Sequence, residues 1–267
     1  MSARIIARGI PLDANSSHLP GTAQGPAALR AEIAKDYANL CAENGVDLAD
    51  PAVFRFGPDI DLANTAGDAD YPAIEAAVAE ILAEGAKPLM IGGDHSVSVP
   101  VLRAIAKAGP APVIVHFDAH PDLYEAYEGS PWSHACPFAR IIEESLCARL
   151  IQIGIRTLNA HQREQIRRFG VECFDMTSLP ESLPLGADEP VYVSIDLDAL
   201  DPAFAPGVSH PEPGGLSTRQ LIAYLQAIPG PVVGADLVEF NPGRDVSGMT
   251  AAAALKLMKE LGGLLAR

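Results

Sequence analysis

Short, continuous apolar runs that alternate along the chain with helical patterns constrain the fold most strongly. Eight runs are typical of strands, at residues 4–10, 53–57, 88–93, 112–118, 150–155, 171–176, 191–198 and 232–240. Continuous rather than alternating apolar residues indicate strands that are buried on both faces. The helical patterns between them supply the crossovers that parallel strands require. We therefore predict an α/β protein, a three-layer sandwich with a parallel sheet of about eight strands.

Six segments have the apolar spacing of helices, at residues 27–34, 70–86, 97–109, 136–144, 218–228 and 250–265. In the second of these, Ile74, Val78 and Ile81 recur at helical spacing ahead of Gly85, a residue type that commonly ends helices. No repeat, low-complexity tract or linker interrupts the chain, and 178–190 is a long Pro-rich loop. The pattern predicts a single domain over residues 1–267.

Composition and charge argue against several classes of protein. Of the 267 residues 48% are hydrophobic, but no apolar run reaches the ~18 residues of a membrane span. The start of the chain lacks an apolar signal segment, so we expect a cytoplasmic protein. The formal net charge of -15 would repel a phosphate backbone, so nucleic acid is not an expected partner, and neither is a membrane. The four cysteines form no C-x-x-C pair and are expected to be reduced and packed.

Acidic residues and histidines gather where four of the predicted strands end. They are Asp94 and His95; Asp118, His120 and Asp122; Asp196, Asp198 and Asp201; and Asp236 and Glu239. The carboxyl ends of parallel strands lie at one edge of a sheet, which is where α/β proteins bind ligands. Crowded carboxylates raise one another's pKa values and oppose folding unless cations neutralise them. The sequence therefore predicts a site for more than one metal ion at this edge.

The ligand types at this edge favour a particular metal and chemistry. Carboxylate oxygens with two imidazoles and no sulfur suit Mn(II) best, ahead of Fe, Co, Ni or Zn. Two divalent ions would balance the charges of four aspartates, and a bridging hydroxide would leave the ligand shell slightly negative. Those aspartates are Asp118, Asp122, Asp196 and Asp198. Ions ~3.5–4 Å apart activate a shared water at neutral pH, and a site of this charge prefers a cationic substrate.

Simpler interpretations compete for three residues near these strand ends. Carboxylates at strand ends often cap helices or close turns, and this is the favoured interpretation for Asp94 and Asp201. His116 lies on the same side of its predicted strand as Asp118, so it either supports the metal site or is simply packed. Both interpretations of His116 stay open.

Four blocks of the sequence resemble the signature motifs of the ureohydrolases, the arginase and agmatinase family. They read GGDHS, DAHPD, SIDLDALDPAFAPG and VEFNP, and they occur in the family's order. The resemblance runs from about GIPLDANSS to the C-terminus. Two further segments, DLYEAYEGSPWSHACPFARI and PGVSHPEPGGLS, are most similar to plant-type arginases. The resemblance implies an arginase-like fold and the hydrolysis of a guanidino compound to urea and an amine.

The resemblance also implies the metal ligands. They are His95 and Asp122 on one ion, His120 and Asp198 on the other, and Asp118 and Asp196 as bridges. Two Mn²⁺ ions per subunit are the implied cofactor. Homotrimers or homohexamers are the implied assembly.

Two further roles are carried over from the family. Its proton-shuttling histidine falls on His134, and its guanidinium-binding glutamate falls on Glu239. Guanidinium is a delocalised, poor electrophile, so a hydroxide must be positioned at its carbon while the leaving amine receives a proton. Asp122 would relay that proton, Glu239 would bind the planar cation, and His134 would bind substrate and exchange protons with solvent.

The residues expected around the far end of the substrate leave its identity open. Animal-type arginases carry acids that recognise the α-amino group where this chain has Asn159 and Gln162, and Asn159 is a predicted substrate-binding residue. The loop before His134 offers two acids and two hydroxyls, Glu125, Glu128, Ser130 and Ser133. The plant-type resemblance favours L-arginine, cleaved to L-ornithine and urea. The alternatives are agmatine, cleaved to putrescine and urea, 4-guanidinobutyrate, and a non-catalytic metal-binding protein on the same scaffold.

Overall fold

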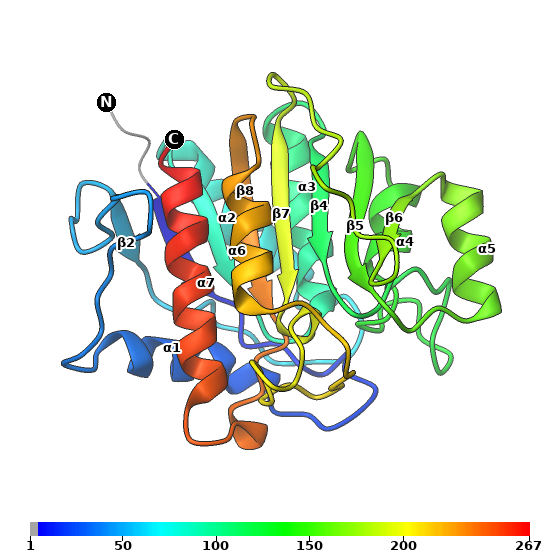
Figure 1. Ribbon diagram of the computed structural model, residues 1–267, viewed down its shortest axis with the longest axis horizontal. Helices are drawn as coiled ribbons and strands as arrows, with labels where there is room; N and C mark the ends of the chain where they lie inside the picture. Colours follow the sequence, from blue (N-terminus) through cyan, green and yellow to red (C-terminus); the bar gives the residue numbers. More distant parts are fainter. Residues whose placement is uncertain (1–4) are drawn as a thin grey trace.

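A single sheet of eight parallel strands forms the centre of the computed structural model, which describes residues 5–267 (Figure 1). The strands lie in the order β2-β1-β3-β8-β7-β4-β5-β6. They are Ile5–Gly9 (β1), Phe54–Phe56 (β2), Lys87–Ile91 (β3), Val113–Phe117 (β4), Arg149–Ile155 (β5), Glu172–Asp175 (β6), Val191–Asp196 (β7) and Val232–Val238 (β8). The predicted parallel α/β sheet is confirmed. Residue 4 of the first predicted strand lies outside the described residues, and the single domain over 1–267 stays a prediction.

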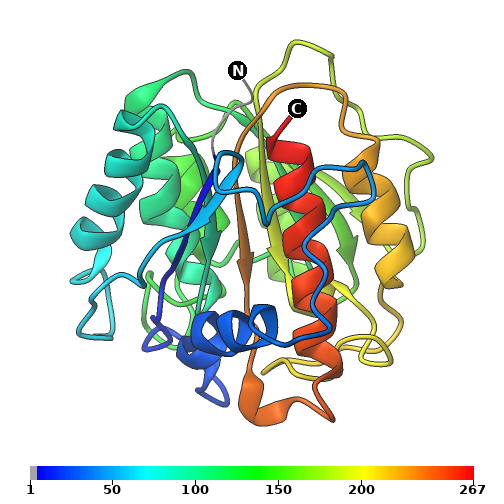
Figure 2. The same ribbon diagram turned by 90° about the vertical axis from the view of Figure 1, so that its left-hand side faces the viewer.

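Helices cover both faces of the sheet, which gives the predicted three layers (Figure 2). Helices α6 and α7 pack on one face, where α1 lies against α7, and α2, α3 and α4 pack on the other. Their bounds are Gly25–Ile33 (α1), Tyr71–Ala83 (α2), Ser98–Ala108 (α3), Pro137–Glu143 (α4), Thr218–Gln226 (α6) and Met249–Leu265 (α7). Each face buries its own apolar cluster, so every central strand is packed on both sides, as its continuous apolar run predicts.

The sequence patterns do not predict helix α5, Ala160–Phe169. Its residues are mostly polar, and of its apolar residues only Ile166 and Phe169 pack against the sheet cluster on the side of α2. The signals that mark it are at its ends. The side chain of Asn159 accepts a hydrogen bond from the Gln162 N–H as an N-cap, and Gly170 ends the helix in the left-handed conformation with φ of 65°.

The register of the sheet aligns four buried polar residues in one row across β5, β4, β7 and β8. Gln152 pairs with His116, His116 with Ser194, and Ser194 with Asp236. Paired residues of neighbouring parallel strands point to the same face, so these side chains lie next to one another. We call them the polar row. The row lies one residue before the carboxyl end of β4 and two residues before those of β7 and β8, directly beneath the acidic edge of the sheet.

Two expectations from composition can be compared with the structure. No helix within residues 5–267 is long and apolar enough to cross a membrane. All four cysteines are free thiols, and Cys136 is buried. The expectation that all are packed is wrong for Cys41, which is exposed because it lies in a surface loop after α1.

Candidate metal centre and active site

The acidic edge of the sheet brings all six predicted metal ligands together. His95 opens the short helix η2 (His95–Val97) after β3, and the other ligands follow β4, end β7 or lie in the short helix η3 (Leu197–Ala199). Five of the six are buried and the sixth, His120, is half-buried. Since β3, β4, β7 and β8 are central and parallel, their carboxyl ends converge, which is why residues far apart in sequence meet here.

The first group of ligand atoms surrounds the ring of His95. Its Nδ1 atom lies 3.2 Å from Asp118 Oδ2, 3.2 Å from Asp122 Oδ2 and 3.3 Å from Asp196 Oδ2. This buried nitrogen has no hydrogen-bond partner within the described residues. A nitrogen lone pair that faces three carboxylate oxygens is an arrangement that a divalent cation fits.

The second group surrounds the ring of His120. Its Nδ1 atom lies 3.0 Å from Asp198 Oδ2 and 3.4 Å from Asp118 Oδ1. Asp118 therefore presents one oxygen to the His95 group and the other to the His120 group. This is the position that the resemblance assigns to a bridging carboxylate, and the two groups provide places for two cations. Asp196 gives Oδ2 to the first group, while its Oδ1 accepts a hydrogen bond from the Asp198 N–H at 2.8 Å.

The electrostatics of these carboxylates favour bound cations. Burial and the neighbouring charges of Asp198 and Asp118 raise the pKa of Asp196 well above its usual value. Burial and Asp118 also raise the pKa of Asp198 to about 6. Burial would lower the pKa of His95, but the three carboxylates around it raise that pKa well above the usual value. Positive charge is therefore stabilised at this point, and a metal ion can supply it.

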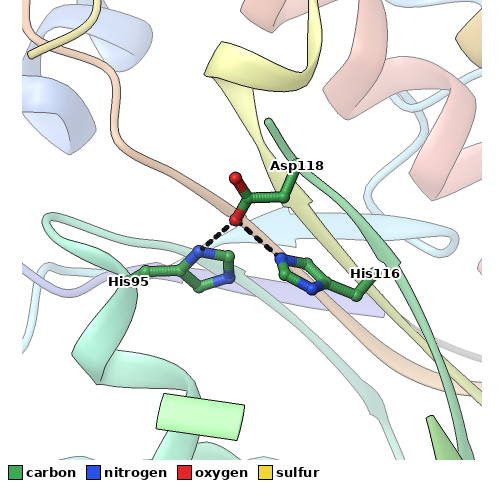
Figure 3. Close-up of side chains that lie close together, drawn as sticks. All are labelled: His95, His116 and Asp118. Carbon is green, nitrogen blue, oxygen red and sulfur yellow. Dashed lines mark hydrogen bonds and ion pairs between the residues drawn. The ribbon is translucent and has the colours of Figure 1, made fainter. Parts of the chain in front are cut away.

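His116 contacts a predicted metal ligand, which favours the first of the two interpretations that the sequence leaves open. Gln152 Nε2 donates to the Pro121 carbonyl at 2.7 Å and also contacts His116 Nδ1 at 3.0 Å, so that ring nitrogen accepts. The opposite nitrogen, Nε2, then carries hydrogen and donates to Asp118 Oδ2 at 2.7 Å. Figure 3 shows this carboxylate oxygen between the rings of His95 and His116. The ring of His116 is further fixed by stacking on Phe138.

The other half of the polar row fixes the ring of His95. Its Nε2 lies 2.9 Å from Ser194 Oγ, and that hydroxyl donates to Asp236 Oδ1 at 2.6 Å. Since the hydroxyl hydrogen is used on Asp236, Ser194 accepts from His95 Nε2–H and leaves Nδ1 free for a metal. Asp236 Oδ2 also accepts from the hydroxyls of Ser98 and Tyr192, both at 2.7 Å. Asp236 therefore lies one layer below the metal centre and orients a ligand.

Asp94 and Asp201 have the structural roles that the sequence favours. Asp94 caps η2 by accepting from the Ser96 N–H at 3.0 Å, and it also accepts from the Asn15 N–H at 3.0 Å. Burial and the charge of Glu239 raise the pKa of Asp94 to about 7. Asp201 closes a turn by accepting from the N–H groups of Ala203, at 2.9 Å, and Gly214, at 2.6 Å. Neither aspartate belongs to the two groups around His95 and His120.

His134 and Glu239 lie together beside the metal centre. His134 Nδ1 is 2.8 Å from Glu239 Oε1, and the same oxygen accepts from the His95 N–H at 2.9 Å. Burial would lower the pKa of His134, but Glu239 raises it to about 9, so the ring carries a proton at neutral pH. Burial would raise the pKa of Glu239, but His134 keeps it below its usual value. The second oxygen, Oε2, is buried and has no hydrogen-bond partner within the described residues.

Two catalytic candidates have strained backbones. Asp122 has φ of 53° and Glu239 has φ of 63°, in the left-handed region that residues other than glycine rarely adopt. Such conformations cost on the order of 1–3 kcal/mol and persist only where the surroundings hold them. At Glu239 the N–H donates to the Gly93 carbonyl at 2.8 Å, which ties it to the loop before His95. Strain of this kind concentrates at functional sites.

A pocket of roughly 200 Å³ opens beside the metal centre. The lining residues that belong to the predicted site are His120, Asp122, His134, Asp196, Asp198 and Glu239, and we call them the inner wall. The other polar residues of the lining are Ser17, Tyr124, Tyr127, Thr157, Gln162 and His210, and we call them the outer wall. The inner wall is thus acidic apart from its histidines, whereas the side chains of the outer wall are hydroxyls, an amide and an imidazole.

Several pocket residues have no role in the sequence predictions, and two of them, Ser17 and His210, lie next to His134. Ser17 Oγ lies 2.9 Å from His134 Nε2, on the side of the ring opposite Glu239. The ring of His210 lies 5.0 Å from that of His134 and 6.1 Å from that of His120. Burial and His134 lower the pKa of His210 to about 4, so this ring is neutral. Both residues lie in segments that resemble the family. A hydroxyl and an imidazole in such segments are the features from which a role in the site could be predicted.

The structure gives Asn159 a different environment from that of Gln162. Asn159 is exposed, its Oδ1 caps α5, and its Nδ2 donates to the Tyr124 hydroxyl at 2.6 Å. It therefore contacts the pocket wall through Tyr124, and its substrate-binding role stays a prediction. Gln162 lines the pocket directly, and its buried Oε1 has no hydrogen-bond partner within the described residues.

The two acids of the loop before His134 lie away from the pocket wall. Glu125 is exposed and forms an ion pair with Arg168. Glu128 is also exposed, and its φ is 49°. Neither carboxylate contributes to the wall described above. These acids are therefore not placed to favour an amine over a carboxylate at the far end of a substrate.

The fold and this site together define a metal-dependent hydrolase of the α/β class. Buried carboxylates and imidazoles provide places for paired cations, which activate water, and a charged histidine lies next to the pocket. A free carboxylate oxygen in the same wall can accept N–H groups of a cationic substrate.

The comparisons with known proteins identify the family. The arginase family model matches residues 3–263. The chain is 45% identical over 274 residues to the mitochondrial arginase 1 of Arabidopsis thaliana, covering 97% of this chain and 80% of that protein. It is 36% identical over 265 residues to an agmatinase of Bacillus cereus, covering 97% and 91%. The solved arginase of Medicago truncatula superposes with a TM-score of 0.93 at 41% identity, covering 100% of this chain and 88% of that one.

The chain therefore belongs to the arginase family, a family of metal-dependent enzymes, and is a ureohydrolase. The resemblance found in the sequence motifs is confirmed, including its similarity to plant arginases. The non-catalytic alternative is set aside, since the chain matches a family of enzymes and its predicted ligands lie together beside a pocket that His134 and Glu239 line.

Proposed function

We propose that this protein is a binuclear manganese arginase that hydrolyses L-arginine to L-ornithine and urea. One observation carries the guanidino part of this proposal most directly. Glu239 Oε2 is a buried carboxylate oxygen without a partner, and it lies in the pocket wall beside the two ligand groups. Leaving such an oxygen unpaired is costly, and a guanidinium N–H can pair with it in a charge-assisted hydrogen bond.

The residues around the pocket can divide the reaction between them. When bound by the two ligand groups, paired divalent ions acidify water and so make a nucleophile available at neutral pH. Glu239 holds the planar guanidinium so that its carbon faces the nucleophile. Asp122, which lines the same wall, relays a proton toward the leaving amine. His134, charged at neutral pH and outside the ligand groups, exchanges that proton with solvent.

Manganese is proposed on the chemistry of the donor set. The two groups provide aspartate oxygens and two imidazole nitrogens, with no sulfur among their atoms. This combination suits Mn(II). Homotrimeric or homohexameric assembly and a cytoplasmic location stay predictions that rest on the sequence.

The outer wall of the pocket supports arginine over agmatine. The α-carboxylate of arginine needs hydrogen-bond donors, and the hydroxyls of Ser17, Tyr124 and Tyr127 line that wall. The competing acid, Glu125, is paired with Arg168 instead. The higher identity to the Arabidopsis arginase than to the Bacillus cereus agmatinase points the same way.

Agmatine is the second candidate because of Gln162. Its unpaired Oε1 in the pocket wall can accept from an ammonium group. Agmatine presents a free amine at its far end, and arginine presents an α-ammonium next to its carboxylate. The Gln162 acceptor alone therefore does not discriminate between arginine and agmatine. Donors that bind the carboxylate of arginine would discriminate between them.

Parallel urea assays test the proposal. Protein loaded with Mn(II) is supplied with L-arginine, agmatine or 4-guanidinobutyrate, and kcat/KM is measured for each. We expect the value for arginine to be highest. If pocket donors are desolvated, loss of the carboxylate could lower kcat/KM by ~10⁴–10⁵. A higher value for agmatine would overturn the choice of arginine, and no urea from any of the three would overturn the guanidino chemistry.

A further inference from the structure

Arg156, directly after β5, makes an unusual set of contacts beside the metal centre. All six hydrogen bonds of its guanidinium end on backbone carbonyls. The acceptors are Asp198 at 2.7 Å, Glu212 at 2.6 and 3.0 Å, Gly154 at 3.1 Å, Leu200 at 3.3 Å and Ala199 at 3.4 Å. An arginine used in this way is a scaffold for loops, because its rigid fork fixes the positions of several acceptors at once.

These acceptors include the backbone of a predicted metal ligand. Asp198 and Ala199 belong to the single turn η3, whose last carbonyls have no partner within so short a helix. The guanidinium of Arg156 donates to the Asp198 carbonyl, and it contacts the Ala199 carbonyl, which also accepts from the Leu216 N–H at 3.0 Å. These contacts fix the loop that carries the Asp198 carboxylate. The neighbouring Thr157 lines the pocket, whereas the fork of Arg156 lies among these carbonyls.

The backbone of Arg156 holds the opposite side of the same ligand group. Its N–H donates to the Ala119 carbonyl at 2.9 Å, and the Ala119 N–H donates to Asp198 Oδ1 at 3.0 Å. Ala119 lies between Asp118 and His120 in the chain. One residue therefore joins the segment that carries His120 to the segment that carries Asp198.

A glycine makes room for this arrangement. A Cβ atom on Gly215 would lie 2.6 Å from Arg156 Nη2, 2.7 Å from the Asp201 backbone nitrogen and 2.8 Å from the Ala199 carbonyl oxygen. All three distances are shorter than atoms tolerate, so a side chain at residue 215 would separate the fork from the carbonyls of η3 by displacing the fork, the backbone that follows η3, or both. Gly215 is therefore the position from which the contacts of Arg156 can be disturbed without replacing the arginine.

The His95 group has a separate support. Its ring is fixed by Ser194 and Asp236 from the polar row, and no hydrogen bond of the Arg156 side chain reaches a residue of that group. We propose that Arg156 is a positioning residue for one half of the metal centre, and that it sets the affinity of the His120 and Asp198 half for its cation. This inference rests on the two-metal site of the proposed function.

The test compares Arg156→Lys with Arg149→Lys. Arg149 begins the same strand at its opposite end, where it pairs with Glu172 and Glu189, so it is a matched control. Metal-free protein is titrated with Mn(II) alone by calorimetry, and the bound ions are examined by electron paramagnetic resonance. A lysine ammonium cannot span the five carbonyl acceptors.

We expect wild type and Arg149→Lys to bind two ions and to give the signal of a coupled pair. Arg156→Lys should bind one ion as tightly as wild type and the second ~10–100-fold more weakly, with the signal of an isolated Mn(II) at low loading. Gly215→Ala should also weaken the binding of the second ion alone. This variant tests the role of Arg156 if Arg156→Lys does not fold.

Three outcomes are distinguishable. Two unchanged affinities in Arg156→Lys, or an equal loss in both sites, would overturn the role of Arg156. An equal second-site loss in Arg149→Lys would do so as well, because the effect would then not be local. Wild type that binds a single ion would instead overturn the two-metal part of the proposed function.

Discussion

The two halves of the metal centre use similar ligands but are supported in different ways. The side chain of His95 is 0% exposed, whereas that of His120 is 29% exposed. His95 is fixed by the polar row, which the register of the sheet aligns. The His120 half is held by loop segments that Arg156 joins.

The difference shows that the residues which bind a metal and the residues which hold those ligands in place are determined by different parts of the chain. Buried strands position the His95 half, because the side chains that fix the His95 ring come from residues paired on neighbouring strands. Hydrogen bonds between loops position the His120 half, and both halves contribute residues to the pocket lining. We therefore expect mutations of the supporting residues to affect the halves one at a time, and mutation of a shared residue to affect both.

Loss of the carboxylate shared by both halves should have the largest effect. Asp118→Ala removes the oxygens that face His95 and His120, and it leaves the His116 Nε2–H without its acceptor. We expect loss of both metals and a fall in urea release beyond the ~10²–10⁴ typical of a lost general acid or base. Metal analysis and a urea assay on the folded variant measure this. His95→Ala is the control, and its loss of urea release should be smaller because it removes a ligand of one half only. Two ions still bound to Asp118→Ala would refute the bridging role of Asp118.

Replacement of the histidine outside both halves should leave both intact. His134→Ala removes the ring that joins Glu239 to Ser17, so we expect kcat to fall by ~10²–10⁴ with two ions still bound. Steady-state kinetics and metal analysis check the two parts separately. Added imidazole should restore part of the rate. An unchanged kcat would make His134 an ordinary loop residue.

The smallest effect is expected from a support of the His95 half alone. Ser194→Ala removes the acceptor of His95 Nε2–H and leaves that buried donor unpaired, which costs about 1–3 kcal/mol. Mn(II) affinity should fall ~10–100-fold at one site and stay unchanged at the other. In the double variant with Arg156→Lys, both sites should be weakened. If Ser194→Ala weakened the same site as Arg156→Lys, the two halves would not be supported separately.

The sequence predicted the sheet because its central strands are continuous apolar runs between turns. It missed α5 because the buried face of that helix includes Gln162 and Gln165, so apolar periodicity is weak there. The predicted metal ligands meet as expected, because parallel strands place their carboxyl ends at a common edge. Residues that follow strands can therefore be assigned to this edge from the sequence alone, without knowledge of the strand order.

Strand order and register are what the sequence did not provide. Asp236 was noted at a strand end, but its contact with Ser194 depends on how β7 and β8 align. The roles of Arg156 and Ser17 depend on loops that meet only after folding. Asn159 was expected to bind substrate from its place in the motif, and its side chain also caps α5, a helix that the patterns did not predict.

Titration of the metal-free protein with Mn(II), with urea release from L-arginine followed at each step, tests the central claim most directly. We expect no urea without metal, two binding steps per chain, and activity that appears with the second ion, because the nucleophile depends on the pair. Full activity in the metal-free protein, or full activity with a single bound ion, would contradict a catalytic site built from two differently supported halves.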